Sequence, residues 1–119
     1  GVAKMIKQLG DDKVRFNLAL SLHAPTDKKR NEIMPINDSN NIKTLVDALN
    51  EFYQETGNEI TLEYILFKDF NDSLKDADEL IKISAIFVSC SLTCSNSEHF
   101  SSTCCSKSLI FSKACSKFR

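Results

Sequence analysis

The sequence predicts an α/β fold in which helices surround a parallel sheet. Two observations support this prediction. Apolar residues recur with the helical period of 3.6 in some segments and with the strand period of two in others, and the two kinds of segment alternate along residues 1–83. The predicted order is helix, strand, helix, strand and helix. Because parallel strands need helical crossovers between them, this alternation predicts a parallel sheet with its helices outside.

The first predicted helix covers residues 2–9, and Gly10 can end it. Its apolar residues lie on one stripe and are Val2, Met5, Ile6 and Leu9. The first strand is predicted from Val14 to Leu22, because every second residue of this segment is a large apolar one.

A short helix and a longer one are predicted between the strands. Thr26 can cap the short helix, and Pro35 stops it. The core-facing residues of the short helix are expected to be Ile33 and Met34. Asn40 or Asn41 can cap the longer helix, and Gly57 can end it. The apolar stripe of the longer helix fits the 3.6-residue period and consists of Ile42, Leu45, Val46, Leu49, Phe52 and Tyr53.

The second strand is predicted from Glu59 to Phe67. Asn71-Asp72 marks a loop, and Ser73 can cap a last helix. The inner face of that helix is expected to hold Ala77, Leu80 and Ile81. Parallel strands are normally covered on both faces, and two strands alone make a poor sheet. We therefore expect uncovered apolar surface that favours self-association or poor solubility.

The composition is that of an ordinary soluble chain. The 119 residues carry a formal net charge of -1, with 26% charged and 42% hydrophobic residues. This balance lacks the strong basic excess of a self-sufficient nucleic-acid binder. The sequence has no apolar run long enough for a membrane span and no secretory signal, which indicates a cytoplasmic location. The chain starts with Gly1 rather than Met, which suggests a start within a longer sequence.

The composition changes near residue 83. Residues 84–119 are rich in Ser and Cys, contain almost no acidic residue, and show no sustained period. We expect this segment to be either a disordered tail or the product of a reading-frame slip. All five cysteines lie in it: Cys90, Cys94, Cys104, Cys105 and Cys115. Their odd number argues against a closed disulfide framework, so reduced thiols are expected.

An ordered set of motifs runs from Phe16 to Asp72. The motifs are Phe-Asn-Leu-Ala-Leu-Ser-Leu-His-Ala-Pro from Phe16, then Arg30, Ile-Met-Pro-Ile-Asn from Ile33, Asn41-Ile42, Ile-Thr-Leu-Glu-Tyr-Ile-Leu-Phe from Ile60, and Asn71-Asp72. This ordered set resembles the dual-specificity ribosomal and transfer RNA adenine C2-methyltransferases, a branch of the radical S-adenosylmethionine (SAM) superfamily. The resemblance covers residues 1 to about 83. Related adenine C8-methyltransferases that confer antibiotic resistance share much of this pattern, so C2 and C8 both stay open.

The resemblance implies a piece of a partial (β/α)6 barrel, about two βα units in residues 1–83, followed by a non-matching tail over residues 84–119. It also implies SAM and a [4Fe-4S] cluster as cofactors of the full-length parent, with ribosomal and transfer RNA as partners. Ser21, Leu22 and His23 match the family's Ser-Leu-His stretch, which contacts SAM. They would lie at the carboxyl end of a parallel strand, where barrel enzymes place their sites.

The parts that carry out the chemistry in the family have no counterpart here. The Cys-x-x-x-Cys-x-x-Cys loop that holds the cluster would lie before Gly1, as would a further SAM-contacting serine. A later Asn-Pro pair is missing, and no tail cysteine can be assigned as the methyl carrier. The match is lost after about residue 84, where a buried strand should follow, and this loss favours the frame slip. We therefore expect no catalytic residue, no metal ligand and no methyl transfer in this chain alone.

Other chemical interpretations have weaker support. Cys90 and Cys94 could suggest a cluster-binding loop, but such a loop needs a third cysteine three residues after Cys94, and that position is Ser97. A zinc site could draw on Cys90, Cys94, His99, Cys104 or Cys105, although their spacing matches no strong pattern. Glu63 could line a barrel interior without being catalytic.

The basic run Lys28-Lys29-Arg30 could touch RNA phosphates, but an exposed run of this kind is more often a solvated face. Two further interpretations of the whole chain stay open. It could be a non-enzymatic remnant or interaction module, or a piece of a barrel enzyme with unrelated chemistry.

Overall fold

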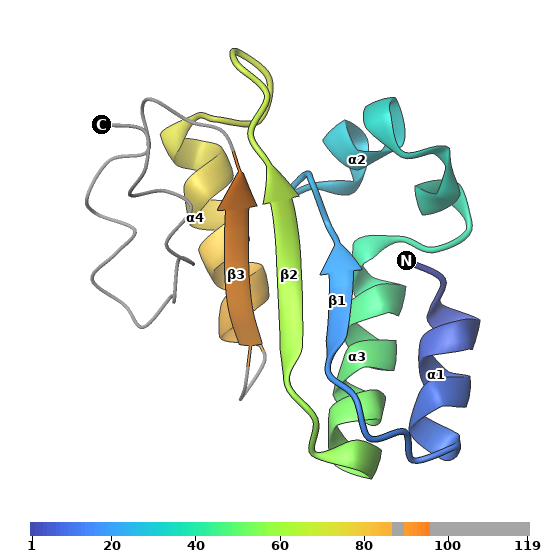
Figure 1. Ribbon diagram of the computed structural model, residues 1–119. Coiled ribbons are helices and arrows are strands. Elements are labelled where there is room, and N and C mark those ends of the chain that lie inside the picture. The colour runs from blue at the N-terminus through green and yellow to red at the C-terminus, as the bar shows by residue number, and fades with distance from the viewer. Residues whose placement is uncertain (87–89, 96–119) are drawn as a thin grey trace.

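The computed structural model describes residues 1–86 and the backbone of residues 90–95. Its strands are β1 (Leu18–Ser21), β2 (Ile60–Ile65) and β3 (Cys90–Ser95). They form a three-stranded parallel sheet in the order β1-β2-β3, as Figure 1 shows. The predicted parallel α/β arrangement is therefore confirmed for the described part of the chain.

Strand β3 corrects the predicted two-strand sheet. It lies inside the segment predicted as a tail and pairs with all of β2, from Ile60 opposite Cys90 to Ile65 opposite Ser95. A strand edge offers backbone hydrogen bonds to Ser- and Thr-rich segments as well as to apolar ones, which composition alone does not reveal. The rest of the predicted tail, residues 87–89 and 96–119, lies outside the described residues, and with it the prediction of disorder or a frame slip there.

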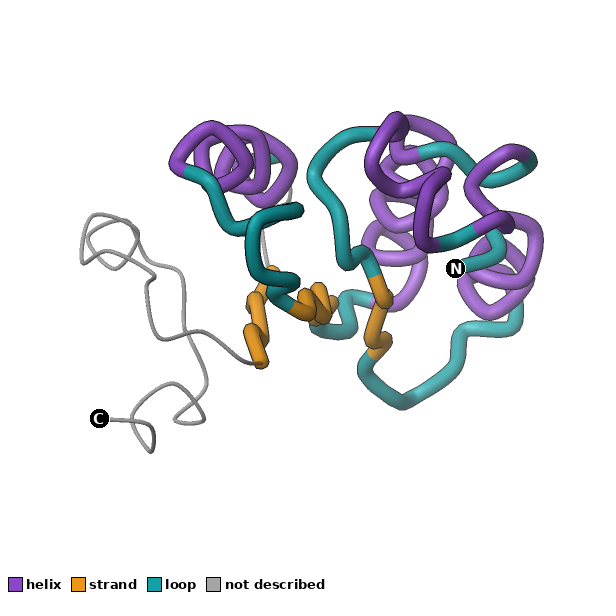
Figure 2. Tube along the Cα trace, turned by 90° about the horizontal axis from the view of Figure 1, so that it is seen from above, coloured by secondary structure: helices purple, strands orange, loops and turns teal. Residues whose placement is uncertain are grey.

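The helices are α1 (Ala3–Asp11), α2 (Asp27–Ile33), α3 (Ile42–Thr56) and α4 (Leu74–Ala85), with a 3-10 turn (Pro35–Asp38) after α2. Figure 2 shows them on the same side of the sheet. The core between the helices and the sheet contains the predicted stripe of α3 and the inward residues of β1 and β2. Its members include Leu20, Leu45, Leu49, Phe52, Ile60, Leu62, Tyr64 and Leu80.

Local capping chemistry sets the helix boundaries, largely as predicted. Thr26, Asn41 and Ser73 each accept a hydrogen bond from a backbone amide in the first turn of α2, α3 and α4. Gly57 ends α3 in a left-handed conformation with φ 68°. Gly10, in contrast, does not end α1.

The role of Gly10 is to let two helices approach. It lies inside α1 and is buried, and a Cβ at this position would lie 3.3 Å from the Cα of Phe52 in α3. The predicted cap is therefore wrong, because close packing of α1 on α3 accounts for this glycine better than its backbone freedom.

Strand β1 is shorter than the predicted Val14–Leu22 segment. The Asn58 side-chain amide donates to the carbonyl oxygens of Val14 at 2.6 Å and Phe16 at 3.0 Å, which holds this stretch as a connection below the strand. None of the described helices has the length and apolar character needed to cross a membrane.

The sheet face without helices has a different composition from the core face. On β1 and β2 its residues alternate with the core residues and are Ala19, Ser21, Thr61, Glu63 and Ile65. Among these residues only Ile65 is large and apolar. The expected apolar surface is therefore small on these two strands, and self-association stays a prediction.

Candidate functional site

Ser21 and Glu63 meet at the carboxyl ends of β1 and β2. The register of the two strands places these residues directly opposite each other. The Ser21 hydroxyl donates to the Glu63 carboxylate, with 2.9 Å between Oγ and Oε2. Both side chains lie on the face without helices, at the edge where parallel α/β proteins bind their ligands. The pair combines an anionic acceptor with a hydroxyl.

His23 lies immediately beyond this pair in an unusual backbone conformation. Its φ is 57°, in the left-handed region that favours glycine. The His23 amide donates to the Glu63 carbonyl oxygen at 3.3 Å, and the Ile65 amide donates to Nδ1 of the imidazole at 3.3 Å. Because Nδ1 accepts a hydrogen bond, the neutral ring carries its proton on Nε2.

The charge state of His23 follows from its surroundings. Burial lowers the pKa of the imidazole, the Glu63 carboxylate raises it, and the Arg30 guanidinium lowers it, so that the pKa lies below its ordinary value. The ring is therefore neutral at pH 7. It can donate one hydrogen bond through Nε2.

Leu22, between these two residues, is a core residue. Its side chain is 1% exposed, its amide donates to the Glu63 carbonyl oxygen, and its own carbonyl oxygen accepts from Nε of Arg30 at 3.2 Å. Of the three predicted SAM contacts, Ser21 and His23 keep partly exposed side chains. Any contribution of Leu22 is therefore through the fold of the turn.

Arg30 contradicts its predicted outward position, since it is 0% exposed. Its guanidinium donates to the carbonyl oxygens of Ser21 at 3.4 Å and Asn40 at 3.1 Å, in addition to Leu22, and to the Asn37 side chain. The end of β1 leaves carbonyl groups that need donors, and a planar guanidinium can satisfy several at once. Arg30 therefore stabilises the backbone around the site, and its buried guanidinium cannot contact RNA phosphates.

Sequence reasoning missed this buried role of Arg30 and set Glu63 aside. The position of Glu63 opposite Ser21 depends on strand register, which the sequence does not specify for strands 42 residues apart. The burial of Arg30 depends on carbonyl groups brought together by the fold. The one available signal was the presence of both residues in the motifs that carry the resemblance.

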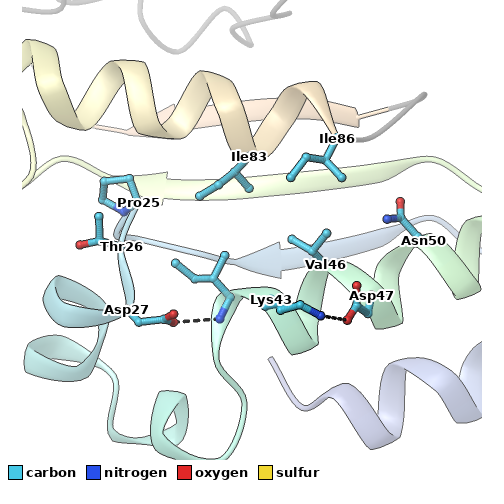
Figure 3. A pocket seen from close by; sticks show the side chains of 10 residues that line it. Pro25, Thr26, Asp27, Lys43, Val46, Asp47, Asn50, Ile83 and Ile86 are labelled. Carbon is cyan, nitrogen blue, oxygen red and sulfur yellow. Dashed lines mark hydrogen bonds and ion pairs between the residues drawn. The ribbon is translucent and has the colours of Figure 1, made fainter.

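A groove of about 580 Å³ lies on the other side of the sheet, between α3 and α4 (Figure 3). Its lining is Pro25, Thr26, Asp27, Ile42, Lys43, Val46, Asp47, Asn50, Ile83 and Ile86. Asp27 accepts from the Ile42 amide at 2.9 Å, and Lys43 pairs with Asp47 at 3.1 Å. Because these charged groups already have protein partners, we place the candidate site at the strand ends.

The described residues contain no group of three or more His, Cys, Asp or Glu side chains that could hold a metal ion. Cys90 and Cys94 both belong to β3, four residues apart, which corresponds to about 13 Å along an extended strand. A cluster-binding loop instead brings its cysteines around one centre. The other members of the considered zinc site, His99, Cys104 and Cys105, lie outside the described residues.

Comparisons with known proteins agree on one family, although no family profile matches the chain. The chain is 58% identical over 80 residues to a probable dual-specificity RNA methyltransferase RlmN of Cytophaga hutchinsonii, covering 67% of this chain and 22% of that protein. It is 45% identical over 86 residues to the corresponding protein of Salinibacter ruber, covering 71% and 23%. The chain thus spans less than a quarter of the length of these relatives.

A solved structure shows the same fold. The crystal structure of a radical SAM methyltransferase from Sphaerobacter thermophilus matches with a TM-score of 0.75 and 33% identity, over 79% of this chain and 27% of that one. The three-stranded sheet and its helices therefore have the arrangement of a segment of a radical SAM methyltransferase.

Proposed function

Because this chain belongs to the family of the dual-specificity RNA methyltransferases, we propose that residues 1–86 supply part of the SAM-binding surface of a radical SAM enzyme. We propose further that this enzyme methylates adenine C2 in ribosomal and transfer RNA. The segment would form about two βα units of its partial (β/α)6 barrel. The observation that carries the proposal is the Ser21–Glu63 pair beside a neutral His23, at the carboxyl ends of two parallel strands.

The polar groups at these strand ends fit SAM. The Glu63 carboxylate can accept hydrogen bonds from ribose hydroxyls or from the methionyl ammonium group, and the Ser21 hydroxyl can donate or accept. The Nε2–H group of His23 can donate to a carboxylate or a hydroxyl. SAM, when bound, supplies the methyl group, while these side chains orient it and exclude water. The sheet face without helices gives it room.

The residues present do not fit a [4Fe-4S] cluster. The sequence contains no Cys-x-x-x-Cys-x-x-Cys motif, and among the described residues no three ligands converge. We therefore derive no step through a cluster. We propose that this chain alone binds SAM weakly and transfers no methyl group.

Titration of the purified chain with SAM, followed by two-dimensional NMR, tests the proposed surface. SAM should shift the signals of residues 21–23 and 63, and Ser21→Ala should weaken binding several-fold by removing one hydrogen bond. Ser39→Ala is the matched control, because the Ser39 hydroxyl donates to the Ile36 carbonyl oxygen and accepts from the Asn40 side-chain amide at the end of the 3-10 turn. A folded chain whose strand-end signals do not respond to SAM would overturn the proposal.

A second experiment tests the proposed lack of activity. After anaerobic incubation with iron, sulfide and SAM, the chain should show no [4Fe-4S] spectrum and should leave ribosomal and transfer RNA unmethylated. A stable cluster spectrum together with SAM cleavage would contradict this part of the proposal.

A further inference from the structure

Asn71 lies in the loop between β2 and α4 and is 1% exposed. Its side-chain amide donates to the carbonyl oxygens of His23 at 2.7 Å and Ile65 at 2.8 Å. Its Oδ1 accepts from the Phe67 amide at 2.7 Å, and its backbone carbonyl oxygen accepts from the Tyr64 hydroxyl at 3.0 Å. The polar atoms of this side chain are therefore fully engaged, and they join the loop after β2 to the turn after β1.

The bond to His23 distinguishes Asn71 from an ordinary loop asparagine. The contacts with Ile65 and Phe67 are local and would stabilise the loop alone. The bond to the His23 carbonyl oxygen spans 48 residues and reaches a different turn. That turn has the left-handed backbone at His23, which is strained for a non-glycine residue and persists only where its surroundings hold it.

Asn71 also binds both residues that form the imidazole hydrogen bond, His23 and Ile65. The Ile65 amide donates to Nδ1 of His23, and the Ile65 carbonyl oxygen accepts from the same Asn71 amide group that holds the His23 carbonyl oxygen. A single side chain thus fixes the backbone of His23 relative to the residue that orients its ring. Aspartate could not do the same, because a carboxylate would meet two carbonyl oxygens.

We propose that Asn71 is the positioning residue of the candidate site. By holding the carbonyl groups of His23 and Ile65, it keeps the imidazole on the Ile65 amide, fixes the proton on Nε2, and so leaves Nε2–H for a ligand acceptor. The identity of that ligand rests on the proposed function. The positioning of His23 by Asn71 does not, and the two can be tested separately.

The experiment is an NMR titration of the histidine Cε1–H signals against pH in the full chain. The sequence contains two histidines, His23 and His99, so a His99→Gln variant assigns the signals. In Asn71→Ala the His23 ring should lose its hydrogen bond from the Ile65 amide and become more exposed to solvent. The pKa of His23 should then rise from its lowered position towards its ordinary value, and amide hydrogen exchange at Ile65 should accelerate about tenfold or more.

Asn40→Ala is the matched control. Asn40 is another buried asparagine, whose Oδ1 accepts from the Ala3 amide at 2.7 Å and whose side-chain amide donates to the Ser39 hydroxyl. Within the described part of the chain its side chain makes no hydrogen bond to the turn at His23. This variant should lose stability without changing the titration of His23. If Asn71→Ala does not fold, Asn71→Ser, which keeps one donor, is measured in the same way and should give a smaller shift of the same sign.

The outcomes separate the two proposals. An unchanged His23 titration and unchanged Ile65 exchange in a folded Asn71 variant would overturn the positioning role, whatever SAM does. A changed titration in a chain that does not respond to SAM would support the role of Asn71 and overturn the proposed SAM surface. The same change in Asn40→Ala as in Asn71→Ala would mean general destabilisation and would also overturn the positioning role.

Discussion

Lys29 of α2 and Asp76 of α4 form an ion pair, with 2.6 Å between Nζ and Oδ1. The Asp76 side chain is 6% exposed and also accepts from Ser73 at the start of α4. Lys29 donates in addition to the Phe70 carbonyl oxygen and lies 5.6 Å from the centroid of the Phe70 ring. The helices that follow β1 and β2 are thus linked next to the loop that contains Asn71.

This ion pair predicts a dependence of stability on pH. Burial opposes ionisation of Asp76, but hydrogen bonds from Lys29 and Ser73 outweigh it and lower the pKa. Since the folded-state pKa lies below the unfolded one, Asp76 stabilises the fold above the unfolded pKa, and this stabilisation is lost as pH falls through the folded pKa. Urea unfolding of Asp76→Asn should therefore differ most from the wild type near neutral pH and less towards about pH 3.

Asp78→Asn controls for the loss of a carboxylate in α4, because Asp78 is exposed. It should leave the free energy of unfolding nearly unchanged across the same range. A difference between Asp76→Asn and the wild type that stays constant with pH would refute the role of this carboxylate.

Arg30→Ala should destabilise the chain by about 3 kcal/mol or more. The substitution leaves the buried carbonyl groups of Ser21, Leu22 and Asn40 without this donor. Arg30→Lys should recover only part of this loss, because an ammonium group lacks the planar fork. Chemical unfolding measures both variants, with exposed Arg15→Ala as control. A loss in Arg30→Ala no larger than that of Arg15→Ala would contradict the structure.

Gly57→Ala should lower the free energy of unfolding by about 1 kcal/mol. A Cβ at Gly57 meets no atom within 4 Å, so the expected loss comes from the backbone, whose φ is 68°. Gly57→Asn should lose less, because asparagine tolerates the left-handed region better. Thermal unfolding of both variants checks this order, and an alanine variant as stable as the wild type would show that the left-handed turn is absent.

Glu63→Gln should lower the pKa of His23 further. Burial already lowers this pKa, whereas the Glu63 carboxylate raises it, so removal of the negative charge removes a raising influence. The same histidine titration measures the effect, with exposed Glu59→Gln at the other end of β2 as a control. An unchanged pKa of His23 in Glu63→Gln would mean that the two side chains are not neighbours.

The features that the sequence predicted correctly depend on local chemistry. The caps at Thr26 and Ser73, the end of α3 at Gly57 and the apolar stripe of α3 all follow from residues within a turn or two of each other. Ser21 and His23 were found through a resemblance carried by contiguous motifs. Their partly exposed positions at the end of β1 agree with that expectation, and their contact with SAM stays a proposal.

The features that it did not predict depend on long-range pairing. Charge alone suggested a solvated Arg30, but the free carbonyl groups at the end of β1 require a buried donor. Ser- and Cys-rich composition suggested a tail where β3 pairs with β2. Asn71 was read as a loop marker, because nothing in its neighbourhood in the sequence indicates a bond to His23.

The register between β1 and β2 also determines when the candidate site forms during folding. Leu18 pairs with Ile60, and the Ser21–Glu63 and His23–Ile65 bonds each close a separation of 42 residues. Closing a loop of this length costs conformational entropy before the contacts that stabilise it can form, and parallel pairing is intrinsically slow. Each βα unit contributes only half of these bonds, so neither unit can form the site alone. The site should arise in the same late step that joins the two strands, and partial unfolding that separates them should abolish it at once.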